Sequence, residues 1–321
     1  MRETMTFVIE RLVGVFLRHG LYSSQIVHQV LRINRRKVYS IKDFMRESTS
    51  SGKTQVKFTG RILFLTDDTS LMNSPRHPYL DWDGPLPFAH RGGASDVPEN
   101  TMEAFQYAID LGYRYLETDV HVTSDGVLVA FHDNDLQRTC GRPGKISELP
   151  WSEVSKALVD GKAPIPQLED LIGAWPEARI NIDCKTGPAV DALIASLRRT
   201  KSLARVCVAA FSDARLRRLR KAFGAELCSS LGPVELGLLR FGLLRNPPGL
   251  AAQVPVKQGP LTVVNRKFVE RSHHLGLQVH VWTIDDAPEM ERLLDLGVDG
   301  IMTDRPVILR QVLESRGLWH S

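Results

Sequence analysis

The chain has 321 residues, of which 43% are hydrophobic, and its formal net charge is +4. This length allows one large domain with a full hydrophobic core and an additional segment. The charge is uneven, because residues 1–71 hold 12 Lys and Arg against 6 Asp and Glu, whereas residues 72–321 hold 29 against 31. The larger part shows no basic stripe with interleaved aromatic residues, so nucleic-acid binding is not expected.

Residues 1–71 differ in pattern from the rest of the chain, and we interpret them as an N-terminal extension to a domain formed by residues 72–321. An amphipathic stretch at residues 6–31 could lie peripherally on a membrane surface or pack on a partner. The simpler interpretation is an extension without a catalytic role. No apolar run reaches the roughly 18 residues of a transmembrane segment, and Glu10 and Arg11 interrupt the most apolar N-terminal stretch.

The chain has four cysteines, and none of them forms a CxxC pair. This usage is typical of buried or idle thiols in a reducing compartment rather than of a disulfide framework. We therefore expect a cytoplasmic protein. Nothing in the sequence specifies an oligomeric state.

From residue 85 onward, short apolar runs alternate with segments of helical periodicity. The expected strands lie at residues 85–90, 113–122, 178–185, 205–212, 225–231, 261–266, 277–284 and 299–303. The expected helices lie at residues 100–112, 167–175, 188–199, 213–224, 268–276 and 286–297. Eight strands alternating with helices predict an α/β fold, a (β/α)8 TIM barrel, with a doubly wound open sheet as the alternative.

Two kinds of helix end support this division of the chain. Asn100 and Glu103 have the spacing of a capping box at a helix start. Gly112, Gly276 and Gly297 follow helical segments, where glycine commonly ends a helix.

Polar residues gather where such a barrel places its reactive groups, at the carboxyl ends of the strands. Glu117 and Asp119 are two residues apart, so both side chains point to the same side of one strand. Two adjacent carboxylates repel each other, and a divalent cation with a preference for oxygen ligands removes that conflict. The alternative is a pair of solvated acids at the end of a strand.

The segment INIDCK follows the same logic, because Asp183 and Lys185 share one face of the next expected strand. Asp183 could supply a third carboxylate to the cation, and Lys185 could neutralise a substrate anion. The alternative is an internal ion pair between these two residues.

His90 and His132 each follow an apolar run, and they are the candidates for proton transfer. Histidine titrates nearest to neutral pH, so two imidazoles can serve as acid and base in one cycle. His280 is a weaker candidate, since packing in the core explains it equally well. Gly92 and Gly93 let the backbone turn sharply after the first expected strand, but no P-loop or GxGxxG pattern indicates nucleotide binding.

With these residues collected, residues 86–313 resemble the glycerophosphodiester phosphodiesterase family. The motifs that carry the resemblance are HRGGASDVPENT, LETDVHVTSDGVLVAFHD, IPQLEDLI, INIDCK, VWTID and GVDGIMTDRP, all in the expected order. The resemblance implies a TIM barrel with a short insertion after the second strand, here residues 136–166. It implies a divalent cation, Mg²⁺ or Ca²⁺, held by Glu117, Asp119 and Asp183.

The resemblance further implies that His90 and His132 are the catalytic histidines. It implies that Arg91 and Lys185 contact the phosphate and that Trp282 lines the glycerol site. The chain departs from the family pattern at Asp183, where the family usually has Glu, and at Asp285, which ends a segment usually written VWTxN. The shorter Asp183 side chain puts the identity of the metal in question.

The expected activity is metal-dependent hydrolysis of a small glycerophosphodiester to an alcohol and glycerol 3-phosphate. One alternative is a lysophospholipase D-like or sphingomyelinase D-like enzyme acting on lipid head groups, with residues 231–250 as an apolar and basic surface near the site. The other is a non-catalytic barrel that binds phosphate esters, which only Asp183 favours.

Overall fold

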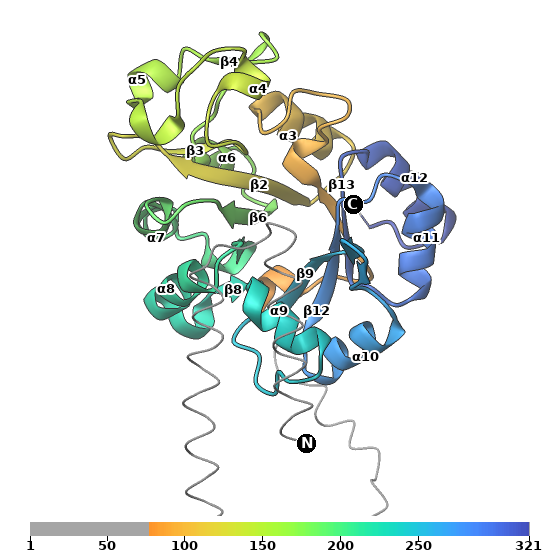
Figure 1. Cartoon of the computed structure of the whole chain (residues 1–321). Coiled ribbons are helices and arrows are strands. Elements are labelled where there is room, and N and C mark those ends of the chain that lie inside the picture. The colour runs from red at the N-terminus through yellow and green to blue at the C-terminus, as the bar shows by residue number, and fades with distance from the viewer. Residues whose placement is uncertain (1–76, 321) are drawn as a thin grey trace, which may run out of the picture. The chain divides into compact units, whose positions relative to one another are not determined.

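The computed structural model describes residues 77–320, so the predicted boundary between the extension, residues 1–71, and the domain, residues 72–321, lies outside the described residues. Eight parallel strands form a barrel (Figure 1). They are β1 (Leu86–Ala89), β2 (Tyr115–Val122), β6 (Arg179–Cys184), β7 (Val206–Ala209), β8 (Cys228–Ser229), β9 (Ala251–Pro255), β12 (Gln278–Trp282) and β13 (Gly300–Thr303).

The strands pair in the order β8-β7-β6-β2-β1-β13-β12-β9. A parallel bridge between Ser230 and Ala251 joins the two outer strands, so the sheet returns to itself. The predicted (β/α)8 barrel is therefore confirmed, and the open doubly wound sheet is excluded.

Helices surround the strands, as Figure 1 shows for the region from α7 to α12. They are α3 (Met102–Asp110), α6 (Leu168–Ala174), α7 (Ala189–Thr200), α8 (Asp213–Phe223), α9 (Pro233–Arg240), α10 (Arg266–His274), α11 (Ala287–Asp295) and α12 (Pro306–Ser315). Each buries an apolar face; on α7, Leu193 and Leu197 are fully buried. No helix within residues 77–320 has the length and apolarity needed to cross a membrane.

Short 3-10 helices connect these elements: η2 (Pro78–Leu80), η3 (His90–Gly92), η5 (Leu203–Arg205) and η6 (Gly224–Glu226). Gly112, Gly276 and Gly297 all have positive φ after helices, as predicted. The predicted capping box at Asn100 is wrong by one residue. Thr101 is the N-cap of α3, and its side chain accepts a hydrogen bond from the Ala104 amide.

One barrel strand lies outside the predicted segments. The segment 261–266 was expected to supply it, but β11 (Leu261–Thr262) pairs only with β10 (Lys257–Gln258) in a small antiparallel hairpin. The barrel strand is β9, which pairs with β12 over five residues from Ala251 to Pro255. Its sequence AAQVP has a weak strand signal, because Ala and Pro are depleted in strands and Gln253 interrupts the apolar pattern.

The predicted insertion after the second barrel strand is present (Figure 1). It follows β3 (Leu128–Ala130), which pairs antiparallel with β2. The insertion contains α4 (Gln137–Cys140), η4 (Ile146–Glu148), α5 (Trp151–Val154), β4 (Leu158–Val159) and β5 (Ala163–Pro164). It has a small apolar core of its own, in which Leu136, Ile146 and Val154 are fully buried.

Side chains fill the barrel below its carboxyl end. Tyr79 and Tyr115 are fully buried near the amino ends of the strands, and the Tyr115 hydroxyl donates to the Tyr79 carbonyl at 2.7 Å. His280 is also fully buried, where its ring nitrogens contact Gln253 at 3.3 Å and Gln278 at 3.0 Å. His280 therefore occupies a core position, as the simpler of its two interpretations predicted.

Candidate active site

The turn after β1 places two adjacent functional side chains at the carboxyl end of the barrel. Arg91 has φ of 52°, and Gly92 and Gly93 have φ of 85° and 102°. A Cβ atom added to Gly92 would lie 2.6 Å from the Cβ of Ala104, so only glycine fits there. This tight turn brings the Arg91 amide within 3.2 Å of Oε2 of Glu117, to which it donates a hydrogen bond.

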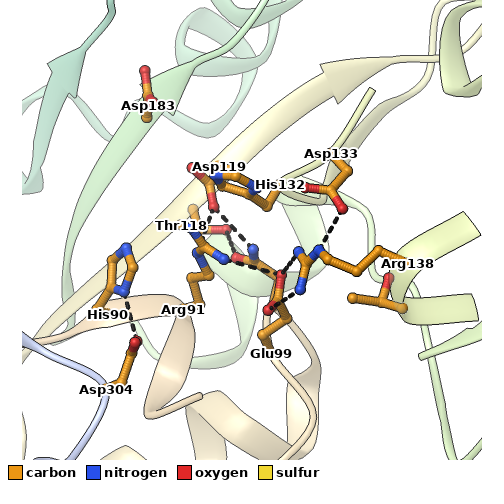
Figure 2. Close-up of polar contacts among 12 residues, drawn as sticks. His90, Arg91, Glu99, Thr118, Asp119, His132, Asp133, Arg138, Asp183 and Asp304 are labelled. Atoms are coloured by element: carbon orange, nitrogen blue, oxygen red, sulfur yellow. Dashed lines mark hydrogen bonds and ion pairs between the residues drawn. The ribbon is translucent and has the colours of Figure 1, made fainter. Parts of the chain in front are cut away.

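His90 lies between two carboxylates from other strands. Its Nδ1 atom is 2.6 Å from Oδ1 of Asp304, and its Nε2 atom is 3.7 Å from Oε2 of Glu117 (Figure 2 shows the contact with Asp304). Burial lowers the pKa of His90, but Glu117 and Asp304 outweigh it, so the pKa is raised above its usual 6.5. Because Nδ1 of His90 is bonded to Asp304, its Nε2 atom faces the other site residues.

Glu117 and Asp119 on β2 are buried carboxylates, 4% and 2% exposed, on the same face of the strand. Burial and the neighbouring Asp119 raise the pKa of Glu117 to about 7. Burial would also raise the pKa of Asp119, but Lys185 and Arg91 reverse the direction and lower it. Asp119 also accepts a hydrogen bond from Asn100 at 3.1 Å. The site thus holds one ionised carboxylate and one that titrates close to neutral pH.

Lys185 connects β2 with β6. Its Nζ atom lies 2.8 Å from Oδ1 of Asp119 and 3.1 Å from Oδ2 of Asp183. Burial raises the pKa of Asp183, and its Oδ1 atom is buried with no hydrogen-bond partner among residues 77–320. The ion pair between Asp183 and Lys185, one of the two interpretations of the INIDCK segment, is therefore present.

The three predicted metal ligands do not form a preassembled cluster. Among residues 77–320, no group of three or more His, Cys, Asp or Glu side chains is arranged to hold a metal ion. Glu117 and Asp119 are neighbours on β2, but Lys185 lies between Asp119 and Asp183. In Figure 2, the Asp183 side chain is drawn apart from the other labelled carboxylates.

His132 reaches this end of the barrel through the β2–β3 hairpin. The amide of Phe131 donates to the Asp119 carbonyl at 2.9 Å, which fixes the chain just before His132. The Nδ1 atom of His132 lies 2.6 Å from Oδ1 of Asp133, and the His132 carbonyl accepts a hydrogen bond from Nε2 of His121 at 3.0 Å. Both candidate histidines therefore have Nδ1 bonded to a carboxylate.

Trp282 lies at the carboxyl end of β12 beside an exposed aromatic residue. Its ring packs edge-on against Phe211, with 5.7 Å between the centroids. Phe211 is 58% exposed, and Nζ of Lys185 lies 5.9 Å from the centre of its ring. An aromatic surface thus borders the cationic part of the site.

Several residues that contact the site were not predicted as site residues from the sequence. Asp304 and Asp133 were visible as acids near expected strand ends, but their histidine partners depend on tertiary contacts. Asn100 contacts Asp119, and Thr118 donates to Asn100 at 2.8 Å. Phe211 directly follows the apolar run of β7, which was the only signal for its position.

Comparisons with known proteins show the family of this chain. The model of the glycerophosphoryl diester phosphodiesterase family matches residues 90–236 and 238–308, more than half of the chain. A Mycobacterium tuberculosis protein named "Probable glycerophosphodiester phosphodiesterase 2" is 39% identical over 259 residues, which cover 77% of this chain and 97% of that protein. Rat "Lysophospholipase D GDPD1" is 30% identical over 270 residues, 71% of this chain and 85% of its own length.

Solved structures share the fold. A putative glycerophosphoryl diester phosphodiesterase from Silicibacter pomeroyi superposes with a TM-score of 0.63 at 24% identity, covering 74% of this chain and 96% of that one. An Oleispira antarctica phosphodiesterase in complex with the product sn-glycerol-3-phosphate gives a TM-score of 0.61 at 21% identity, covering 72% and 97%. By the family match and these relatives, the chain belongs to the glycerophosphoryl diester phosphodiesterase family of enzymes.

Proposed function

We propose that this enzyme hydrolyses glycerophosphodiesters to an alcohol and sn-glycerol 3-phosphate, with a divalent cation and with His90 and His132 as acid and base. One observation carries the assignment of the histidines. Each imidazole has Nδ1 bonded to a carboxylate at 2.6 Å, Asp304 for His90 and Asp133 for His132. Each Nε2 is thereby left to exchange a proton with a substrate oxygen.

Glu117, Asp119 and Asp183 are the residues that would hold the cation. Their chemistry fits an oxygen-preferring ion such as Mg²⁺ or Ca²⁺. The Oδ1 atom of Asp183 is buried and has no hydrogen-bond partner in the described part of the chain, and burial beside Asp119 raises the pKa of Glu117 to about 7. A bound cation would relieve both conditions, and it would supply positive charge to the phosphate oxygens.

Arg91 and Lys185 are the protein cations that would contact the phosphate. Both lie among buried carboxylates, with Arg91 Nε 3.3 Å and Lys185 Nζ 2.8 Å from Asp119. The raised pKa of Lys185, to which Asp183 and Asp119 contribute against the effect of burial, keeps its ammonium charged. Preorganised charge of this kind typically stabilises a transition state by about 3–4 kcal/mol per donor.

The reaction breaks the bond between phosphorus and the oxygen of the departing alcohol. One histidine removes the proton from the attacking hydroxyl as that oxygen bonds to phosphorus. The other histidine gives a proton to the departing oxygen. Attack by water gives sn-glycerol 3-phosphate directly, whereas attack by the glycerol 2-hydroxyl gives a cyclic phosphate that water then opens, with the proton transfers reversed. The two proton transfers balance over one turnover. Trp282, with Phe211 beside it, would contact the apolar face of the glycerol unit.

A second candidate substrate is a lysophospholipid, which carries an acyl chain. The observation in its favour is Phe211, which is 58% exposed at the carboxyl end of β7, and a 30% identical relative carries the name lysophospholipase D. The segment 231–250, expected to supply an apolar surface near the site, is a weaker argument. Its exposed residues Leu238, Phe241 and Leu243 end α9 or come after it, and the chain there returns to the amino end of β9, away from the site.

We propose a cytoplasmic location for the enzyme, since its four cysteines, all within residues 77–320, are free and three of them are buried. Peripheral membrane contact would belong to the lysophospholipase alternative.

The experiment that tests the function is a substrate panel. Purified full-length chain is incubated with glycerophosphocholine, glycerophosphoglycerol and lysophosphatidylcholine, each with Mg²⁺, Ca²⁺ or Mn²⁺ and with EDTA. We expect sn-glycerol 3-phosphate from the water-soluble diesters, abolished by EDTA and restored by a cation. Release of choline from lysophosphatidylcholine, with no cleavage of the two water-soluble diesters, would favour the second candidate. Binding of the esters without turnover of any of them would support the non-catalytic alternative.

A further inference from the structure

Arg138 on α4 belongs to the insertion and has no role in the chemistry described so far. Its guanidinium nevertheless forms three hydrogen bonds with two carboxylates near the site (Figure 2). The Nε atom donates to Oδ2 of Asp133 at 2.5 Å, and Nη1 and Nη2 donate to the two oxygens of Glu99 at 2.9 Å and 2.6 Å. The pair with Glu99 is bidentate, which is the strongest and most directional form of such a contact.

Each of these carboxylates also binds a group of the proposed reaction. Asp133 binds Nδ1 of His132 at 2.6 Å. Glu99 accepts a hydrogen bond from Nη1 of Arg91 at 3.2 Å, and Nε of Arg91 lies 3.3 Å from Asp119. Acidic and basic side chains therefore alternate in an unbroken series of contacts from Asp119 to His132. Arg138 is the member that links Glu99 to Asp133.

The geometry of the guanidinium explains why arginine stands at this position. Only a planar fork can bind both oxygens of Glu99 and still direct its Nε–H at a second carboxylate. Without a cation there, Glu99 and Asp133 would face each other as two acids. Burial would raise the pKa of Asp133, but hydrogen bonds from Arg138 and His132 outweigh it and lower the pKa to about 2. Asp133 is thus an anion at every pH at which the enzyme would work.

The two side chains of the ion pair between Arg138 and Glu99 differ in solvent exposure. The Glu99 side chain is 15% exposed, whereas Arg138 is 49% exposed. An ion pair that is half exposed contributes little to folding stability, because solvent screens it. Arg138 can still orient its partners, because its hydrogen bonds restrict the directions in which the carboxylates of Glu99 and Asp133 can point.

We infer that Arg138 is a positioning residue of the phosphodiesterase reaction. From its place in the insertion, it fixes the two carboxylates that bind the reacting groups, Asp133 at His132 and Glu99 at Arg91. The inference rests on the proposed function, because it treats His132 as a proton-transfer group and Arg91 as a phosphate contact. It assigns the insertion a task in arranging the site. A single side chain sets the relative placement of the acid–base group and the phosphate-binding group.

The first test compares Arg138→Gln with Arg142→Gln. Arg142 lies in the same insertion, and its ion pair among residues 77–320 is a 3.8 Å contact with Glu153, so it is a matched control. We expect the melting temperature of both variants to stay within about 2 °C of the wild type. We expect kcat of Arg138→Gln to fall roughly tenfold to a hundredfold, the range for a misplacement of about 1 Å, and its KM to change less than about threefold. Equal kcat values for Arg138→Gln and Arg142→Gln would overturn the inference.

The second test asks whether Arg138 acts through Asp133. If it does, adding Arg138→Gln to Asp133→Asn should lower kcat by less than about threefold further, because residues that act as a unit are not additive. If the losses of kcat in the two single variants multiply in the double variant, Arg138 acts independently of Asp133, against the inference. Arg138→Lys should recover less than half of the loss, since lysine lacks the fork.

A third measurement does not depend on turnover. The Nδ1 hydrogen bond to Asp133 favours the His132 tautomer that carries its proton on Nδ1, which ¹⁵N NMR of the histidine rings reports. We expect the Nδ1–H fraction of His132 to fall in Arg138→Gln and to stay unchanged in Arg142→Gln. An unchanged tautomer in Arg138→Gln would overturn the inference. If the wild type proves inactive on every diester, the proposed function fails while this measurement still decides the role of Arg138.

Discussion

The Nδ1 atom of His90 lies 2.6 Å from Oδ1 of Asp304, a residue 214 positions later in the chain. The contact joins the turn after β1 to the end of β13, two strands that are neighbours in the barrel. It orients the imidazole so that Nε2 points toward Glu117. It also adds to the raised pKa of His90.

Replacement of Asp304 should therefore alter both rate and pH dependence. In Asp304→Asn, the negative charge is gone, so the pKa of His90 should fall. The limb of the kcat/KM profile that reports His90 should move to lower pH, and kcat should drop by roughly tenfold or more. Steady-state rates between about pH 5 and 9 measure both effects. A profile that matches the wild type would show that Asp304 does not act through His90.

Asp183 should determine the affinity for the cation. Asp183→Asn removes one charged oxygen donor and leaves Lys185 with Asp119 alone. After EDTA treatment and dialysis, the cation concentration for half-maximal activity should rise roughly tenfold or more. Asp191→Asn is the control, because the Asp191 side chain is 77% exposed on α7. Identical cation titrations for the two variants would remove Asp183 from the proposed ligand set.

Gly92 should be intolerant of any side chain. Alanine there would lie 2.6 Å from the Ala104 Cβ and would have to adopt φ of 85°. We expect Gly92→Ala to lower the free energy of unfolding by roughly 1–3 kcal/mol or more, as overpacking and backbone strain together require. Gly187→Ala, where a Cβ atom meets nothing within 4 Å, should stay within about 0.5 kcal/mol of the wild type. Urea unfolding measures both values, and equal stability of the two variants would contradict the prediction.

His280 should make the protein less stable in mild acid. Burial lowers the pKa of His280 to about 4, below its usual 6.5, so the folded state disfavours the charged ring. The contribution to stability is present above about pH 6.5 and is lost as the pH falls toward 4, up to about 3 kcal/mol.

The test is to compare the free energy of unfolding at about pH 7 and about pH 4.5 in the wild type, His280→Gln and His274→Gln. His274 is exposed on α10, so its variant should lose as much stability as the wild type. His280→Gln should lose less. The same loss in all three proteins would show that His280 does not titrate in this range.

The sequence was a good guide to the barrel wherever a strand is continuously apolar. The run VCVA predicted β7, and the apolar run of DGIMT predicted β13. The strand β9 was missed because AAQVP carries small residues and an inward-facing amide, while the more apolar segment LTVV lies outside the barrel sheet, beginning in the hairpin strand β11. Tertiary pairing with β12 outweighs local preference there.

The site was predictable to the extent that strand periodicity determines it. Spacing of two residues placed Glu117 and Asp119 on one face, and the resemblance to the family predicts Arg91 and Lys185 as phosphate contacts. The partners that orient these groups were not predictable. Arg138 and Glu99 are 39 positions apart and meet only because the insertion folds back over the turn before α3. Such contacts leave no periodic signal in a single sequence.

The most direct test of the account is the release of sn-glycerol 3-phosphate from glycerophosphocholine by the wild type, His90→Ala, His132→Ala and His274→Ala, with and without EDTA. We predict release by the wild type and by His274→Ala in the presence of a divalent cation, none with EDTA, and rates at least about a hundredfold lower in His90→Ala and His132→Ala. Near-normal release by either of those two variants, or release that EDTA leaves unchanged, would contradict the proposed chemistry.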